Sequence, residues 1–149
     1  MTIRLATVED VPVIHSLLNE LAGVLGKPDA IRGTEQDLAK YGFGDHPRFE
    51  AILAFEDSEA VGLAVFFSEY STWQGIPGVY VQDLYVSEHV RGGGLGRDIL
   101  SAVEERAKSW GGCYVKLAVY DGNQDAISFY RHLGFELRED EQVLILRDL

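Results

Sequence analysis

The stretch that decides the fold is Arg91-Gly92-Gly93-Gly94-Leu95-Gly96, which follows an apolar run over residues 78–86. That run carries apolar side chains at adjacent as well as alternating positions, as expected for a central strand. After the glycines, Ile99, Val103 and Ala107 repeat at helical spacing. A glycine-rich turn between a strand and a helix brings main-chain N–H groups and the positive end of the helix dipole together. The sequence therefore predicts a phosphate-binding turn.

The spacing of the glycines limits which class of phosphate-containing ligand the turn can bind. A nucleoside triphosphate loop ends in Gly-Lys followed by Ser or Thr, whereas this turn continues Gly96-Arg97-Asp98. The dinucleotide pattern Gly-x-Gly-x-x-Gly fails in both registers, because neither residue 97 nor residue 99 is a glycine. What remains is Arg-x-x-Gly-x-Gly at Arg91, Gly94 and Gly96.

Apolar periodicity predicts a mixed α+β order along one domain, residues 1–149. Thr7 and Asp10 resemble a capping box before an amphipathic helix. Further helices are expected over residues 34–40 and from Asn123, as N-cap, to Gly134. Strands are expected at residues 49–55, 60–67, 78–86, 114–119, 135–137 and 143–146.

The strand over residues 78–86 carries apolar side chains on both faces, so it is expected at the centre of the sheet. If this strand is regular, its side chains alternate between the two faces. One face then holds Val79, Val81, Asp83 and Tyr85, and the other holds Tyr80, Gln82, Leu84 and Val86.

Composition limits the partners. The chain has 24 Asp and Glu against 13 Lys and Arg, and its formal net charge of −11 repels nucleic acid and anionic lipid but attracts a cationic small molecule. It has no signal-peptide pattern and no apolar stretch of about 20 residues, so we expect a cytoplasmic protein without a membrane partner. The four histidines are dispersed, so no metal site is indicated.

The strand, the Arg-x-x-Gly-x-Gly turn and the helix together resemble the acetyl-CoA pyrophosphate signature of the GNAT superfamily of acetyltransferases. Residues 117–135 resemble a second segment of that superfamily, Asn-x-x-Ala-x-x-x-Tyr-x-x-x-Gly-Phe. The matching positions are Asn123, Ala126, Tyr130, Gly134 and Phe135. The resemblance implies the GNAT fold, a central, mostly antiparallel twisted sheet with splayed strands flanked by helices. It also implies acetyl-CoA as the co-substrate.

Four shorter stretches are similar to the spermidine/spermine and thialysine acetyltransferase branch of this superfamily. They are residues 34–38, 42–47, 70–75 and 83–86. Because enzymes of this branch form homodimers, the resemblance implies a homodimer. Ser71 stands where the polyamine-specific members have Asp, which weakens an assignment to spermidine.

The same resemblance implies the groups that handle the coenzyme. Tyr130 is the expected acid that protonates the departing thiolate, and the main chain of the strand at 84–86 is expected to bind the pantetheine arm. The residues expected to contact acetyl-CoA are Leu84, Tyr85, Val86, Arg91, Gly92, Gly93, Gly94, Leu95, Gly96, Arg97, Asn123, Ala126 and Tyr130.

The general base is where the chain departs from the branch, because related polyamine enzymes carry Glu-Asp and this chain reads Gln82-Asp83. Gln82 can hold a water by hydrogen bonds but cannot accept its proton at neutral pH. Asp83 can act as the base if a strand bulge turns it toward the cleft. The alternative for Asp83 is a structural or substrate-pairing carboxylate.

The acceptor is expected to be a small cationic amine, either a diamine or polyamine or an amino-acid-like molecule, which attacks the thioester directly in a ternary complex. Glu35, Asp37, Trp73 and Asp83 are the candidate contacts, through ion pairing and cation–π attraction. Two alternatives stay open. One is acetylation of protein or peptide amines, and the other is an acetyl-CoA-binding sensor without turnover.

Overall fold

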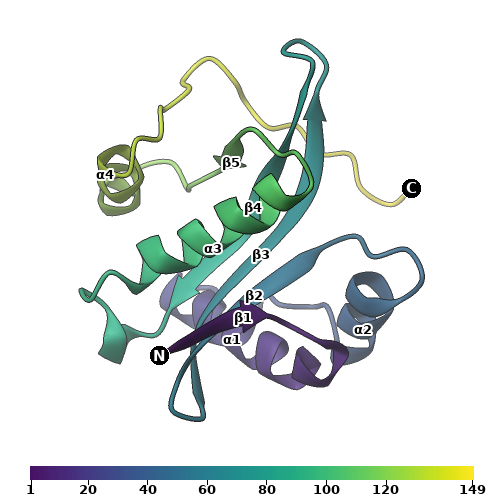
Figure 1. Cartoon of the computed structure of the whole chain (residues 1–149), viewed down its shortest axis with the longest axis vertical. Helices are drawn as coiled ribbons and strands as arrows, with labels where there is room; N and C mark the ends of the chain where they lie inside the picture. The colour runs from purple at the N-terminus through teal and green to yellow at the C-terminus, as the bar shows by residue number, and fades with distance from the viewer. The chain divides into compact units, whose positions relative to one another are not determined.

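A five-stranded sheet with helices on both faces forms the larger part of the computed structural model, which describes residues 1–149 (Figure 1). The strand order is β1-β2-β3-β4-β5, antiparallel except for the parallel pair of β4 and β5. The strands are β1 (Thr2–Leu5), β2 (Glu50–Glu56), β3 (Glu59–Ser71), β4 (Ile76–Val86) and β5 (Val115–Leu117). The helices are α1 (Val11–Val24), α2 (Glu35–Phe43), α3 (Leu95–Ser109) and α4 (Gln124–His132), with 3-10 turns at Val8–Asp10 and Glu88–Val90.

The chain divides into two compact units, Met1–Ala118 and Val119–Leu149. The first unit contains the sheet with α1, α2 and α3, and the second contains α4. The predicted mixed α+β class and the strand–helix–strand crossover through α3 are confirmed. A single domain stays a prediction.

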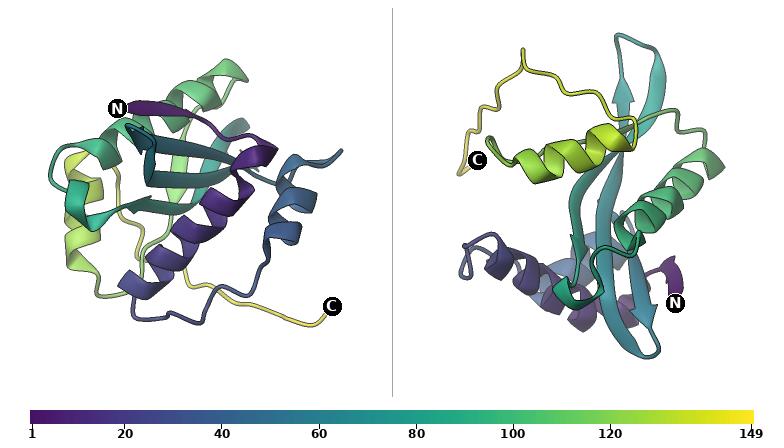
Figure 2. Two further views of the ribbon diagram at one scale, coloured as in Figure 1. Left: turned by 90° about the horizontal axis from the view of Figure 1, so that it is seen from below. Right: turned by 90° about the vertical axis from the view of Figure 1, so that its left-hand side faces the viewer.

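Two apolar layers enclose the sheet of the first unit. Because cross-strand partners share a face, the register separates the strand residues into an α1 face and an α3 face. The buried cluster on the α1 face is Ile14, Leu17, Ala51, Leu53, Leu63, Val65 and Tyr85. The opposite face packs against buried side chains of α3, which are Leu95, Ile99, Leu100, Val103 and Ala107. Figure 2 shows α1 and α3 on opposite sides of the strands.

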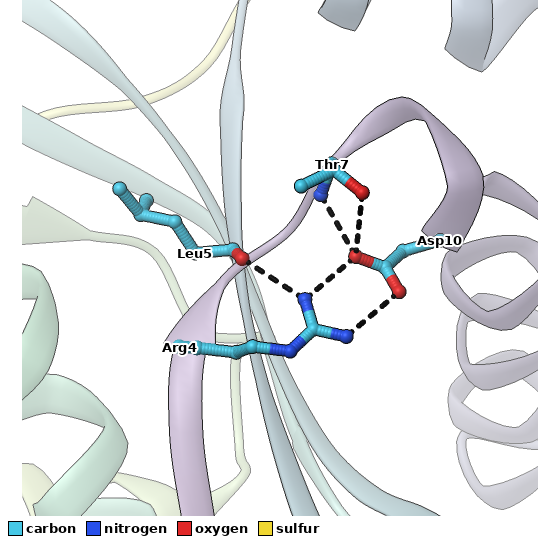
Figure 3. A network of polar contacts seen from close by, with 4 residues as sticks. All are labelled: Arg4, Leu5, Thr7 and Asp10. Atoms are coloured by element: carbon cyan, nitrogen blue, oxygen red, sulfur yellow. Dashed lines mark hydrogen bonds and ion pairs between the residues drawn. The ribbon is translucent and has the colours of Figure 1, made fainter.

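A polar network joins β1 to the start of α1 (Figure 3). The Asp10 carboxylate accepts hydrogen bonds from the Thr7 main-chain N–H at 2.8 Å and from the Arg4 guanidinium at 2.7 and 3.0 Å. The side-chain hydrogen bond from Arg4 is the main reason that the pKa of Asp10 is lowered. The predicted capping box of Thr7 and Asp10 is confirmed. It caps the 3-10 turn Val8–Asp10, which leads into α1.

The strand over residues 78–86, β4 in the structure, is not regular, so the condition under which its side chains were divided between two faces is not met. Val65 on β3 pairs with Asp83, whereas the next residue, Phe66, pairs with Val81, so Gln82 is an extra residue in β4. Such a bulge reverses the alternation of side chains along a strand. As a result Asp83 lies on the α1 face, opposite to Val81 on the α3 face.

The two strands expected at the end of the chain are also absent. No strand follows β5, and β5 itself is shorter than the expected 114–119. Val143, Leu144 and Leu146 are 83, 95 and 82 % exposed. Their β-branched and apolar pattern favours a strand, but a strand forms only where it has a partner to pair with.

Candidate functional site

The site begins near the end of β4, where the sheet opens. β5 pairs only with residues 79–81 of β4, so residues 82–86 have a strand neighbour on β3 alone. The Ser87 N–H donates to the Val61 carbonyl at 2.9 Å. Because antiparallel pairs alternate, the main chain of Tyr85 turns toward β3, while those of Leu84 and Val86 turn toward the open edge. This edge can pair with an extended ligand.

The glycine turn connects this edge to the N-terminus of α3. Gly92 and Gly94 have φ angles of +88° and +83°, in the left-handed region that glycine adopts without strain. Gly94 is the N-cap of the 15-residue helix α3 and supplies no side-chain cap. The first N–H groups of α3 are therefore left for another acceptor, and the helix dipole favours an anion there. This turn fits a diphosphate.

Two arginines flank the turn in different ways. The Arg91 Nε–H donates to the Val86 carbonyl at 2.9 Å, and its guanidinium lies 5.9 Å from the centroid of the Tyr85 ring. The Arg97 side chain is 65 % exposed, and its Nε is 3.9 Å from the Asp98 carboxylate. Arg97 thus offers an open positive charge beside the turn, whereas Arg91 is held against β4.

The bulge gives Gln82, the candidate water-holding residue, and Asp83, the candidate base, different surroundings. Gln82 is exposed, and Asp83 is half-buried on the α1 face. Burial raises the pKa of Asp83, because the surrounding protein disfavours the charged carboxylate. A carboxylate with a raised pKa is a stronger proton acceptor once ionised. The bulge required for a basic Asp83 is present, and the role itself stays a prediction.

The two predicted acceptor contacts on α2, Glu35 and Asp37, differ in exposure and in hydrogen bonding. Glu35 is exposed, whereas Asp37 closes a capping box with Thr34 through N–H to oxygen bonds of 2.8 and 3.1 Å. The main-chain N–H of Thr34 is the largest cause of the lowered pKa of Asp37. Asp37 therefore has a structural task at the start of α2.

Trp73 is not brought together with Asp83. It is 96 % exposed in the turn between β3 and β4. Seven residue steps of β4 separate Ile76 from Asp83, about 23 Å at the usual rise of a strand. A small molecule at Asp83 cannot contact Trp73 of the same chain.

The remaining predicted residues lie in the second unit. The Asn123 side-chain oxygen accepts from the Ala126 N–H at 3.2 Å, which confirms Asn123 as the N-cap of α4. The Tyr130 ring makes edge-on contacts with Phe129 and with Phe135, at centroid distances of 5.1 and 5.4 Å. Burial raises the pKa of Tyr130 to about 12, so its hydroxyl stays protonated at neutral pH.

Two hollows of the first unit lie elsewhere. One, of about 170 Å³, is lined by α1, α2 and the segment between them, with Asp37 and His15 at its wall. The other, of about 410 Å³, lies beside the ion pair of Glu50 with Arg106. Neither is lined by Asp83 or by the glycine turn. No three His, Cys, Asp or Glu side chains gather as ligands for a metal ion, and no helix has the length and apolar character needed to cross a membrane.

The sequence did not indicate the contact between Arg91 and Val86. A bond from a side chain to a carbonyl five residues earlier depends on the path of the intervening turn, and no residue pattern specifies that path. The bulge at Gln82 was foreseen only as a condition, because bulges carry no fixed residue signature when glycine is absent.

Comparison with known proteins agrees with this geometry. The model of the acetyltransferase (GNAT) family matches residues 14–135. The chain is 34% identical over 154 residues to thialysine N-epsilon-acetyltransferase of Mus musculus, covering 97% of this chain and 90% of that protein. It is 31% identical over 139 residues to spermidine/spermine N(1)-acetyltransferase-like protein 1 of Homo sapiens, covering 89% of this chain and 20% of that one.

A solved structure shows the same fold. It is an aminoglycoside acetyltransferase from an uncultured soil metagenomic sample, in complex with sisomicin, with a TM-score of 0.81 and 18% identity over 99% of this chain and 95% of that one. The resemblance to this superfamily, and to its thialysine and spermidine/spermine branch, is confirmed.

Proposed function

The chain belongs to the acetyltransferase (GNAT) family, and on that premise we propose that it transfers the acetyl group of acetyl-CoA to the primary amine of a small cationic molecule. The observation that carries the proposal is the continuity of the site. Beyond the open edge of β4, the chain runs through the 3-10 turn Glu88–Val90 and the left-handed Gly92 and Gly94 to the N-terminus of α3, which has no side-chain cap. One extended thioester with a diphosphate matches this order of main-chain donors.

The chain's own groups divide the binding of acetyl-CoA between them. The main-chain N–H groups of Leu84 and Val86 are available to the pantetheine arm, as if it were an added strand. The N–H groups at the start of α3 take the diphosphate, and Arg97 adds positive charge. In this arrangement the Leu84 N–H bonds to the thioester oxygen at the end of the arm and stabilises its negative charge during attack, while the Val86 N–H holds the arm itself.

The reaction needs a neutral amine. An alkylammonium has a pKa near ~10.4, so about one molecule in 2,500 is neutral at pH 7. We assign the removal of the amine proton to Asp83, directly or through a water held by Gln82. The nitrogen then attacks the thioester carbonyl, a nitrogen–carbon bond forms, the carbon–sulfur bond breaks, and Tyr130 gives its proton to the departing thiolate. The second proton of the amine nitrogen passes to the Tyr130 phenolate, which restores the phenol.

The acceptor we favour is either an amino acid that carries a free side-chain amine or a short diamine. The name of the mouse relative, thialysine N-epsilon-acetyltransferase, supports this class, and the net charge of −11 suits a cation.

We also propose a homodimer. Trp73, exposed at the tip of the β3–β4 hairpin, is then available to contact a second copy rather than its own Asp83.

Two measurements test the proposal in sequence. Isothermal titration should show binding of coenzyme A, and an assay of thiol release should show turnover with at least one amine among lysine analogues, short diamines, spermidine and aminoglycosides. Binding without turnover on the panel or on peptides would identify a sensor. Absence of coenzyme A binding would remove the proposed function entirely.

A further inference from the structure

We propose that Arg91 is a positioning residue, which fixes the glycine turn to the end of β4 through the Val86 carbonyl rather than acting as a phosphate-binding charge. The inference rests on the proposed function, because the two ends that Arg91 joins are those that acetyl-CoA would contact together.

The hydrogen bond from Arg91 to the Val86 carbonyl forms because that carbonyl lies on the open edge of β4. The Val86 carbonyl turns away from β3, because Ser87 and not Val86 bonds to β3 at this point. With β5 ending its pairing at Val81, no strand supplies a donor to that carbonyl. The Arg91 Nε–H supplies it, at 2.9 Å.

A second anchor holds the guanidinium in the same place. It lies 5.9 Å from the centroid of the Tyr85 ring, within the range of a cation–π contact. Tyr85 is only 5 % exposed and belongs to the buried cluster on the α1 face, so it is a rigid support. Arg91 therefore touches both a main-chain group and a core side chain of β4.

Arg91 is also the last residue before the glycines whose side chain contacts β4. Its own N–H bonds to the Glu88 carbonyl at 3.2 Å, which closes the 3-10 turn, and Gly92, Gly93 and Gly94 follow without side chains. The spacing between the amides of β4 and those of the turn therefore depends on Arg91. A lysine in its place keeps the charge but lacks the Nε–H and the planar fork.

The test compares two acetyl donors, acetyl-CoA and acetyl-pantetheine, which has the thioester and the arm but no phosphate. For Arg91→Lys and Arg91→Gln we expect kcat/KM to fall by a similar factor, about 3- to 10-fold, with both donors, because a positioning contact acts on the thioester as well. Arg97→Gln should lower the value for acetyl-CoA alone, and Lys108→Gln, at the far end of α3, should change neither. A loss confined to acetyl-CoA in the Arg91 variants would overturn the proposal.

A second readout needs no turnover. Amide hydrogen exchange of residues 92–95 in the ligand-free chain should be several-fold faster in Arg91→Gln than in the wild type or in Arg97→Gln. Unchanged exchange in Arg91→Gln would contradict the anchoring role. If the wild type binds no coenzyme A, the proposed function fails on that measurement alone, while the exchange comparison still decides whether Arg91 holds the turn.

Discussion

At the scale of single residues, the proposed chemistry depends on two groups whose pKa values are raised by burial. Asp83 is a carboxyl whose charged form is disfavoured, and Tyr130 is a phenol that stays protonated far above neutral pH. A carboxylate with a raised pKa binds the amine proton more firmly, which suits Asp83 as the base. A phenol with a raised pKa keeps its proton until the thiolate forms, which suits Tyr130 as the acid. Each makes a separate prediction.

Replacing Tyr130 with Phe removes only the hydroxyl. We expect kcat to fall by roughly 100-fold or more, as for the loss of a general acid, while the Kd for coenzyme A changes little. Since the pKa of Tyr130 is about 12, the pH profile of the wild type should show no loss from its ionisation below about pH 10. The matched control is Tyr41→Phe on α2, which should retain full activity. An active Tyr130→Phe enzyme would rule out the acid role.

Asp83→Asn should lower kcat by roughly 100- to 10,000-fold, yet stabilise the fold at neutral pH. The raised folded-state pKa means that the native state favours the protonated carboxyl, so this group's contribution to stability is full below its unfolded pKa and is lost as pH rises through the folded pKa. Thermal unfolding should thus show the advantage of the variant growing from pH 4 to pH 8. Asp29→Asn, in an exposed loop, is the control, and a constant difference across pH would be evidence against a buried ionised Asp83.

At the scale of elements, the sequence predicted the helix and strand types well where periodicity was long. The pattern of α3 and the crossover to β5 are confirmed, since apolar residues three and four apart define one helix face. The bulge in β4 was foreseen only as a condition for a basic Asp83. The apolar residues of 78–86 lie at adjacent as well as alternating positions, so their pattern fits a regular strand and a bulged strand equally well. The one extra residue, Gln82, decides which helix Asp83 faces.

The packing of β5 against β4 also depends on a single glycine. A Cβ at Gly78 would lie within 3 Å of three ring atoms of Tyr114, whose hydroxyl donates to Glu69 at 2.8 Å. The ring cannot move away without losing that bond. We therefore expect Gly78→Ala to reduce the free energy of unfolding by about 1–3 kcal/mol.

Chemical denaturation measures this effect, with Gly33→Ala as the matched control. A Cβ at Gly33 meets no atom within 4 Å, and its φ is not left-handed, so that variant should be close to neutral. Equal stability of the two variants would mean that Tyr114 does not pack on Gly78 in solution.

At the scale of the whole molecule, charge is the property that bears on the acceptor. A net charge of −11 produces a field that draws in cations and weakens as salt shortens the Debye length from about 30 Å at 0.01 M to about 8 Å at 0.15 M. For a spermidine-like trication we expect kcat/KM to fall by about tenfold over that range. A monocationic amine should lose clearly less, and equal salt dependence for both would show that steering by the overall field plays no part.

Residue types at fixed spacing along the chain were enough to identify the family, the glycine turn between β4 and α3 and most elements. Glycines at 92 and 94, the helical repeat of α3 and the Asn123 cap each act over a few residues, so the local pattern is sufficient. The folded structure was needed to show which strand edge is open, which face Asp83 occupies and that Arg91 bonds to Val86. These depend on register between distant segments, and a shift of one residue in register changes the face and the partners of every residue that follows.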